Sequence, residues 1–298
     1  MSSKRRKVLL NRFADRGFDV LQRWFCVQDV GKAERRGEML GKLWYRLDKK
    51  HRERSVANLR LAFPDLGGSQ TTALSRRVFL HFGRVAGDFL RSPLRTDAEV
   101  LETTQVEGEH LIAVAEGSEN GIIAVTAHFG NWERFSHWCT ATGRPIAVVA
   151  REANQTGVQE KLQSIREQNG MVVLSRGNAA RAILQRLRHR ELIGLLPDQN
   201  TDESFLPFFG RPAGTVLGPA VLHQRTGAVL LPAYYARVGV GRYRLILHPP
   251  IDLENTEKDP KAIMGRINES LESVIREYPD QWLWMHDRWK DARRQGLL

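Results

Sequence analysis

Cysteine and long apolar runs are both scarce in this sequence. Its two cysteines, Cys26 and Cys139, are too few for a disulfide framework, which fits a reducing compartment. The longest stretches without Asp, Glu, Lys or Arg reach 13 residues, as in Pro212–Gln224, whereas a membrane-spanning helix needs roughly 18 or more. The basic first residues are not followed by a continuous apolar segment. We therefore expect neither a spanning helix nor a secretory signal.

Several motifs that mark catalytic and metal sites are missing as well. The sequence has no C-x-x-C pair, no H-x-x-x-H pair on a helix and no Asp-rich calcium loop, so we expect no metal site. It has no G-x-S-x-G nucleophile elbow, which leaves a lipase-type serine mechanism without a candidate. A phosphate-binding P-loop is also missing. We expect an activity that needs no bound cofactor.

Acidic residues are few in the first 60 positions, which hold 17 Lys and Arg against seven Asp and Glu. The whole chain of 298 residues has a formal net charge of +11, so the remainder is close to neutral. This asymmetry indicates an anionic partner for the N-terminal part, such as membrane phospholipid, nucleic acid or an acidic carrier protein.

Residues 5–27 have the pattern of a basic amphipathic helix. Its arginines fall away from the apolar side, as in helices that lie in a membrane interface. The alternative is a surface helix packed on its own domain. The apolar side consists of Leu10, Phe13, Val20, Leu21, Trp24 and Phe25.

The rest of the chain changes from helical patterns to strand–helix alternation near residue 103. This alternation favours an α/β fold with a mainly parallel central sheet flanked by helices on both faces, preceded by an N-terminal helical segment. We divide the chain into a basic helical region, 1–95, and an α/β domain, 96–298. The expected strands are 105–106, 121–127, 145–150, 171–174, 192–196, 229–235 and 243–248. The expected helices are 33–62, 70–91, 131–142, 155–168, 178–190, 216–226 and 261–278.

The stretch Gly121–Arg134 has the pattern of a buried strand that passes into a helix. Its β-branched residues precede His128, and Asn131 is a candidate N-cap. Open α/β sheets present ligand-binding groups at such junctions. Glu133 follows five residues after His128, so it can accept the proton of one ring nitrogen and leave the other free as a base. The alternative is a structural histidine and a glutamate that favours a helix start.

A second strand ends in polar residues at Asp198, Gln199 and Asn200. If its strand runs parallel to the one before His128, Asp198 lies at the same edge of the sheet. An ordinary turn after a strand is the alternative.

Three arginines are candidates for binding anionic groups. Arg151 ends the strand that follows the His128 helix, and Arg166 lies in a predicted helix. Arg211 lies in the Gly- and Pro-rich segment 204–215, whose amides lead into a helix and predict an anion site. A guanidinium can bind phosphate through paired hydrogen bonds or stabilise negative charge that develops on a thioester oxygen.

Four segments in order resemble the lipid A biosynthesis lauroyl/myristoyl acyltransferase family, within the glycerolipid acyltransferase group that shares an H-x4-D/E signature. They are HFGNWE from His128, DQN from Asp198, PFFGRPAGT from Pro207 and WLWMHDRWK from Trp282. The resemblance extends from about Arg52 to Lys290. It implies a glycerolipid-acyltransferase-like fold and transfer of a fatty acyl chain from acyl carrier protein, or coenzyme A, to a hydroxyl of a lipid A precursor.

The resemblance also implies roles and a location. His128 acts as the base, Glu133 orients it, and Asp198 and Arg166 are functional residues. Gln199, Arg151 and Arg211 join them as substrate-binding candidates, whereas the aromatic segment 281–290 is structural or lipid-facing. The expected location is the cytoplasmic face of the inner membrane, on an anionic surface. Many family members carry an N-terminal spanning helix, which this sequence does not predict.

Three alternatives remain open from the residues. Another phospholipid or glycolipid can be the acceptor. A thioesterase can use the same residues with water. The basic N-terminal part fits a nucleic-acid-binding protein, but no nucleic-acid motif accompanies it, so we expect no nucleic-acid partner.

Overall fold

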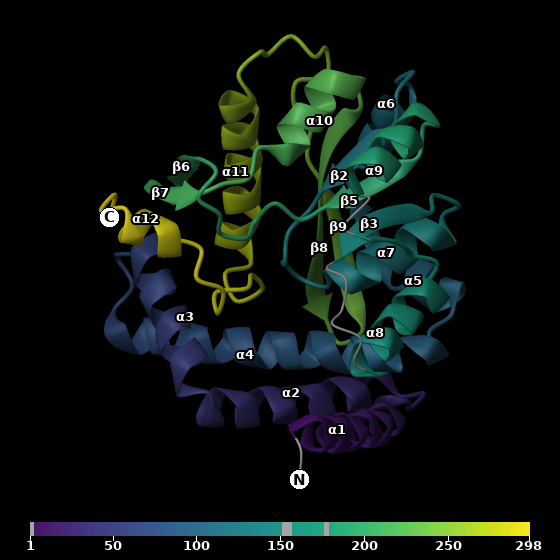
Figure 1. The fold of residues 1–298 in the computed structure, drawn as a ribbon, viewed down its shortest axis with the longest axis vertical. Coiled ribbons are helices and arrows are strands. Elements are labelled where there is room, and N and C mark those ends of the chain that lie inside the picture. The colour runs from purple at the N-terminus through teal and green to yellow at the C-terminus, as the bar shows by residue number, and fades with distance from the viewer. Residues whose placement is uncertain (1–2, 151–156, 176–178) are drawn as a thin grey trace.

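A seven-stranded sheet forms the centre of the fold in the computed structural model, which describes residues 3–150, 157–175 and 179–298 (Figure 1). The strand order is β1-β9-β8-β2-β5-β3-β4, and every neighbouring pair is parallel except β8 and β9. The expected mainly parallel sheet is therefore confirmed. The strands are β1 Thr104–Glu107, β2 Ile122–Val125, β3 Ile146–Ala150, β4 Val172–Ser175, β5 Leu192–Leu195, β8 Val229–Gly239 and β9 Arg242–Leu247.

Helices cover both faces of this sheet, as the alternation of strands and helices predicts. Successive residues of a strand point to opposite faces, so Ile123 and Val125 pack with one group of helices while Ala124 packs with another. The first group comprises α9 Ala179–Arg188, α10 Gly218–Thr226 and α11 Pro260–Glu277. The second comprises α5 Asp97–Glu102, α6 His110–Glu116 and α7 Trp132–Ala141.

The N-terminal helices are α1 Ser3–Phe25, α2 Val30–Leu47, α3 Lys49–Ala62 and α4 Gly68–Arg91. Of these, α1, α2 and α4 lie across one end of the sheet, whereas α3 runs away from them toward the C-terminus (Figure 1). On α4, His81 and Asp88 hydrogen-bond Gly130 and Asn131, which follow β2. Thus α4 covers the carboxyl end of β2. The remaining helices are a 3₁₀ turn Ser92–Leu94, α8 Gly157–Gln168 and α12 Lys290–Arg294.

The structure corrects two of the expected elements. The single helix expected over 33–62 is two helices, because Asp48 ends α2 with its backbone N–H and accepts a hydrogen bond from His51 N at the start of α3. The segment 204–215, expected as a loop, contains the antiparallel hairpin β6 Phe205–Phe208 and β7 Arg211–Gly214. Its two turn residues have positive φ, as a tight hairpin turn requires.

The amphipathic helix expected at 5–27 is α1, and its described end packs inward. Phe25 is buried, and Leu21 and Trp24 pack with it against α4 and α8. Val20, expected on the same apolar side, is exposed. The side chains of Leu10 and Phe13 lie outside the described residues. None of the helices in the described part of the chain combines the length and apolarity required to cross a bilayer.

Candidate active site

His128 and Asp198 meet at the carboxyl ends of two neighbouring parallel strands. Val125 at the end of β2 is in register with Leu195 at the end of β5, and each chain continues three residues further to its polar side chain. The backbone N–H of His128 donates to Asp198 Oδ2 at 2.9 Å, and His128 Nδ1 lies 2.8 Å from Asp198 Oδ1. The expected shared edge is thus found in the structure.

The carboxylate that contacts His128 is that of Asp198, not Glu133, which corrects the orienting role expected for Glu133. Glu133 lies in the first turn of α7, on a side that faces α8. There it binds the guanidinium of Arg166, with Nη2–Oε1 at 2.5 Å and Nε–Oε2 at 3.0 Å. Five residues in sequence therefore do not bring Glu133 to the ring, because α7 directs its side chain to a different partner.

Charge and burial set the protonation of the pair. Burial lowers the pKa of His128, but the negative charge and hydrogen bond of Asp198 outweigh burial and raise it above its ordinary value. Burial raises the pKa of Asp198, and the facing imidazole together with three hydrogen bonds lowers it to about 2. Asp198 is consequently ionised at neutral pH and accepts the Nδ1 proton of His128.

This arrangement leaves Nε2 of His128 without a proton, so that it accepts a long hydrogen bond from the side-chain amide of Gln199. The His128 side chain is 22% exposed, and the amide nitrogen of Gln199 lies 3.4 Å from Nε2. The indole ring of Trp132 forms an apolar wall, with its centroid 5.4 Å from that of the imidazole. In its neutral form, this imidazole has one unprotonated nitrogen beside an apolar wall and is suited to remove a proton from an incoming hydroxyl that displaces the Gln199 amide.

Arg166 presents a fixed positive charge beside this pair. Its hydrogen bond to Glu133 raises the pKa of the guanidinium, which therefore stays charged. The Phe89 ring lies 5.7 Å from the guanidinium carbon. The side chain is 30% exposed, whereas that of Glu133 is only 9% exposed. Glu133 thus holds Arg166 from the protein side and leaves part of the guanidinium accessible.

Comparisons with known proteins identify the family of this chain. A sequence model of the family described as bacterial lipid A biosynthesis acyltransferase matches residues 23–291. The chain belongs to this family. It is accordingly an enzyme that transfers acyl groups.

The relatives of this acyltransferase have low sequence identity but long coverage. The lipid A biosynthesis palmitoleoyltransferase of Escherichia coli (strain K12) is 26% identical over 249 residues, which are 80% of this chain and 79% of that protein. A phosphatidylinositol mannoside acyltransferase of Mycobacterium tuberculosis is 25% identical over 199 residues, 63% of this chain and 62% of that protein. A solved structure of the 1-acyl-sn-glycerophosphate acyltransferase from Thermotoga maritima covers 82% of this chain and 97% of its own, with 14% identity and a TM-score of 0.40.

The C-terminal segment 281–290 forms hydrogen bonds to three residues of the site. Trp282 Nε1 donates to Asp198 Oδ2 at 3.0 Å, and Leu283 N donates to His128 O at 3.1 Å. Arg288 Nη1 donates to the carbonyl oxygen of Gln199 at 2.9 Å. The tryptophans at 282, 284 and 289 are fully buried, so their role is structural rather than lipid-facing. The sequence pattern does not show that this segment reaches Asp198.

Of the remaining substrate-binding candidates, Arg211 is not brought to the site. Arg151 lies outside the described residues. Arg211 is exposed on β7, and among the described residues no hydrogen bond or ion pair connects it to His128, Asp198, Glu133 or Arg166. The amides expected to bind an anion next to it are used internally: Thr215 N donates to Ser204 O and Leu217 N to Glu203 Oε1. No cluster of three or more His, Cys, Asp or Glu suited to a metal ion occurs in the described part of the chain.

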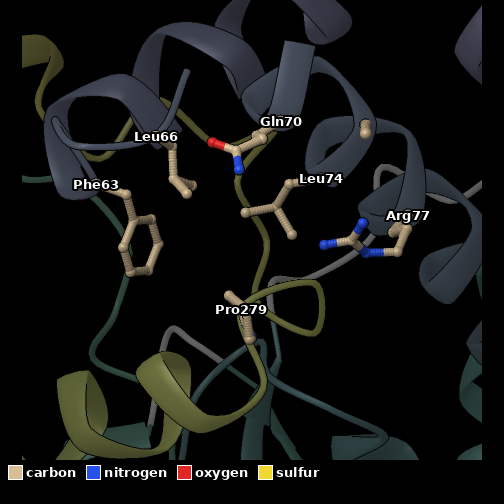
Figure 2. Close-up of a pocket in the computed structure, with 7 residues that line it drawn as sticks. Phe63, Leu66, Gln70, Leu74, Arg77 and Pro279 are labelled. Atoms are coloured by element: carbon tan, nitrogen blue, oxygen red, sulfur yellow. The ribbon is translucent and has the colours of Figure 1, made fainter. Parts of the chain in front are cut away.

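An apolar pocket of about 460 Å³ opens where the turn between α3 and α4 faces Pro279 (Figure 2). Phe63 and Leu74 lie on either side of it, and Arg77 lies at its edge. None of the residues that line the pocket belongs to the group around His128. The full lining is Phe63, Leu66, Gln70, Ala73, Leu74, Arg77 and Pro279.

Gly130 holds the loop between His128 and α7 in a conformation that other residues resist. Its φ is +57°, and a Cβ atom there would lie 1.9 Å from the carbonyl oxygen of Tyr235. Its N–H donates to Gln281 O at 2.8 Å, and its carbonyl oxygen accepts from His81 Nε2 at 3.0 Å. Burial lowers the pKa of His81 to about 4, so this histidine is neutral.

We expect Gly130→Ala to lower the free energy of unfolding by about 2–5 kcal/mol, from left-handed backbone strain plus the collision with Tyr235. Gly143 is the matched control, because its φ is +77° but a Cβ atom there meets nothing within 4 Å. Gly143→Ala should cost only about 1–2 kcal/mol. Urea denaturation of both variants measures the difference, and equal losses would show that the collision is relieved.

Proposed function

We propose that this acyltransferase moves a fatty acyl chain from an acyl thioester to a hydroxyl group of a glycolipid, and that the acceptor is a lipid A precursor. The family and the relatives named for lipid A and phosphatidylinositol mannoside support this acceptor class. The observation that carries the chemistry is the contact between His128 Nδ1 and Asp198 Oδ1, which leaves Nε2 as the unprotonated nitrogen, beside Gln199.

In the proposed reaction, Nε2 of His128 takes the proton of the acceptor hydroxyl as its oxygen attacks the thioester carbonyl carbon. The carbonyl electron pair moves to oxygen and forms a tetrahedral intermediate. Its collapse restores the carbonyl and breaks the carbon–sulfur bond, and the imidazolium returns its proton to the leaving thiolate. Because the acceptor oxygen is the nucleophile, no serine or cysteine of the protein is required. Asp198 stays ionised and stabilises the imidazolium, as the aspartate does in Ser-His-Asp hydrolases.

We assign to Arg166 the binding of negatively charged groups at this site. Glu133 is the residue that positions it. A fixed guanidinium can bind a phosphate of the acceptor or of a phosphopantetheine arm, or the oxygen of the tetrahedral intermediate. Acyl carrier protein is the proposed donor, with coenzyme A as the alternative, since both carry a phosphopantetheine thioester. The proposed location is the cytoplasmic face of the inner membrane.

Labelled acyl thioester, incubated with the enzyme and a lipid A precursor, tests this proposal. We expect the label to appear in the glycolipid, with a matching release of thiol. Label that appears only as free fatty acid would assign a thioesterase instead. Acyl carrier protein and coenzyme A are compared as donors in parallel, and phosphatidylinositol mannoside serves as the competing acceptor.

The ion pair of Glu133 and Arg166 predicts effects that are not additive. We expect Glu133→Gln and Arg166→Met each to lower kcat/KM by about 10–100-fold, the value of a hydrogen bond to a charged group. The double variant should lose little more than Arg166→Met, since Glu133 acts through the arginine. Steady-state kinetics measure the cycle, with Arg186→Met and Glu191→Gln as a control ion pair outside the site. Fully additive losses would show that Glu133 acts independently.

A further inference from the structure

Helix α2 carries an apolar stripe that the protein itself leaves uncovered. Met39, Leu43 and Leu47 are 53%, 51% and 74% exposed. They are four residues apart, so they lie along one face of the helix. Large apolar side chains exposed singly are common, but three along one face form a patch of the kind that binds partners or membranes.

The opposite face of α2 is fully used in packing. Gly37 and Gly41 lie so close to α4 that a Cβ atom at either would be 2.3 or 2.4 Å from a carbonyl oxygen of that helix. Ala33 on the same side is buried. Figure 1 shows α2 on the outer side of α4, away from the sheet, with its C-terminal half extending beyond α1. The stripe is therefore on the outside of the molecule.

Positive charge surrounds this stripe. Lys42 and Arg46 each follow an apolar residue of the stripe by three positions, and Lys49 and Lys50 come after its end; all four are exposed. The acidic residues in and next to α2 all have partners: Glu34 is buried against Arg237, and Glu38 pairs with Lys42 and Arg84. Asp48 contacts His51, and Glu53 pairs with Lys49. Among the described residues, Arg46 and Lys50 are therefore the basic residues at the stripe without an ion pair. An apolar stripe bordered by Lys and Arg is the pattern of a helix that lies in the interface of an anionic bilayer.

We propose that the outer face of α2, with Met39, Leu43 and Leu47 inserted among lipid chains and Arg46 and Lys50 near lipid phosphates, docks the enzyme on an anionic membrane. The surface assigned here is α2, because the described end of α1 packs its apolar side against α4 and α8. The inference rests on the proposed function only in that a lipid acceptor resides at a membrane.

Co-sedimentation with vesicles, without any substrate, tests this surface. The probes are vesicles of phosphatidylethanolamine and phosphatidylglycerol, compared with vesicles of phosphatidylcholine. We expect the wild type to bind the anionic vesicles and the triple variant M39S/L43S/L47S to bind at least about tenfold more weakly. Arg46→Gln and Lys50→Gln should each weaken binding about fivefold and reduce its salt dependence. The matched control is L101S/V238S/V240S, whose replaced residues are 41–63% exposed elsewhere on the molecule.

Three outcomes would overturn the proposal: a wild type that does not bind the anionic vesicles, a triple α2 variant that binds like the wild type, or a control variant that loses binding equally. Sedimentation velocity of the same proteins tests whether a second copy of this chain covers the stripe instead. A wild-type dimer that M39S/L43S/L47S dissociates, with no vesicle binding, would assign the stripe to a second copy of this chain. Acyl transfer to detergent-dispersed acceptor should be unchanged in the triple variant, so loss of docking is distinguished from loss of the proposed chemistry.

Discussion

Asp198→Asn is expected to lower kcat/KM by about 10²–10⁴-fold, the contribution of a correctly prepared general base. Asp198 Oδ2 accepts two hydrogen bonds, from the backbone N–H of His128 and from Trp282 Nε1. The single oxygen of an asparagine will take that position, and its NH₂ group will then face His128 Nδ1. Nδ1 must then accept a hydrogen bond from this NH₂ group instead of donating one. The proton consequently moves to Nε2, and the ring can no longer act as the base.

The same variant should shift the dependence of rate on pH. In the wild type the raised pKa of His128 means that kcat/KM falls as pH decreases through a value above about 6.5, the ordinary pKa of histidine. In Asp198→Asn the larger of the two negative charges that raise this pKa is gone, while burial and the smaller effect of Glu133 remain. The acidic limb of the profile should therefore move to lower pH. Asp97→Asn is the matched control. Asp97 Oδ1 lies 2.9 Å from His137 Nε2, in an aspartate–histidine contact outside the site. An unchanged profile and rate in Asp198→Asn would contradict the assigned role.

His128→Ala removes the base itself and is expected to lower kcat/KM by about 10²–10⁴-fold at every pH. The kcat/KM that remains should no longer show the decrease at acidic pH that protonation of His128 causes in the wild type. The exposed His189 provides the control variant His189→Ala. Near-ultraviolet circular dichroism verifies that both variants keep the native packing. Transfer at nearly the wild-type rate by folded His128→Ala would refute the mechanism.

The position of His128 and Asp198 at one edge of the sheet could be predicted from the sequence, because it depends on local patterns. Short apolar runs ending at His128 and Asp198 indicate buried strands, and parallel strands bring their carboxyl ends together. The pattern does not specify which carboxylate reaches the ring. Glu133 is near in sequence, but its direction is set by the orientation of α7 and by Arg166 on another helix. A tertiary contact over 70 residues, between His128 and Asp198, decides the pairing.

Other parts of the site depend on contacts still further apart in the chain. Trp282 is 84 residues from Asp198, and no spacing rule connects an indole to a carboxylate at that distance. The sequence did not predict the hairpin of β6 and β7, because it contains Pro207 and Pro212 and proline is unusual in strands. The two prolines face each other in the register of the hairpin. The break between α2 and α3 depends on hydrogen bonds of one residue, Asp48.

The titration of the His128 ring by NMR is the most direct test of the central claim, that Asp198 raises the pKa of this histidine and orients its ring. We expect a pKa above about 6.5 in the wild type and a lower pKa in Asp198→Asn, because burial is then opposed only by the smaller effect of Glu133. The same pKa in both proteins would contradict it.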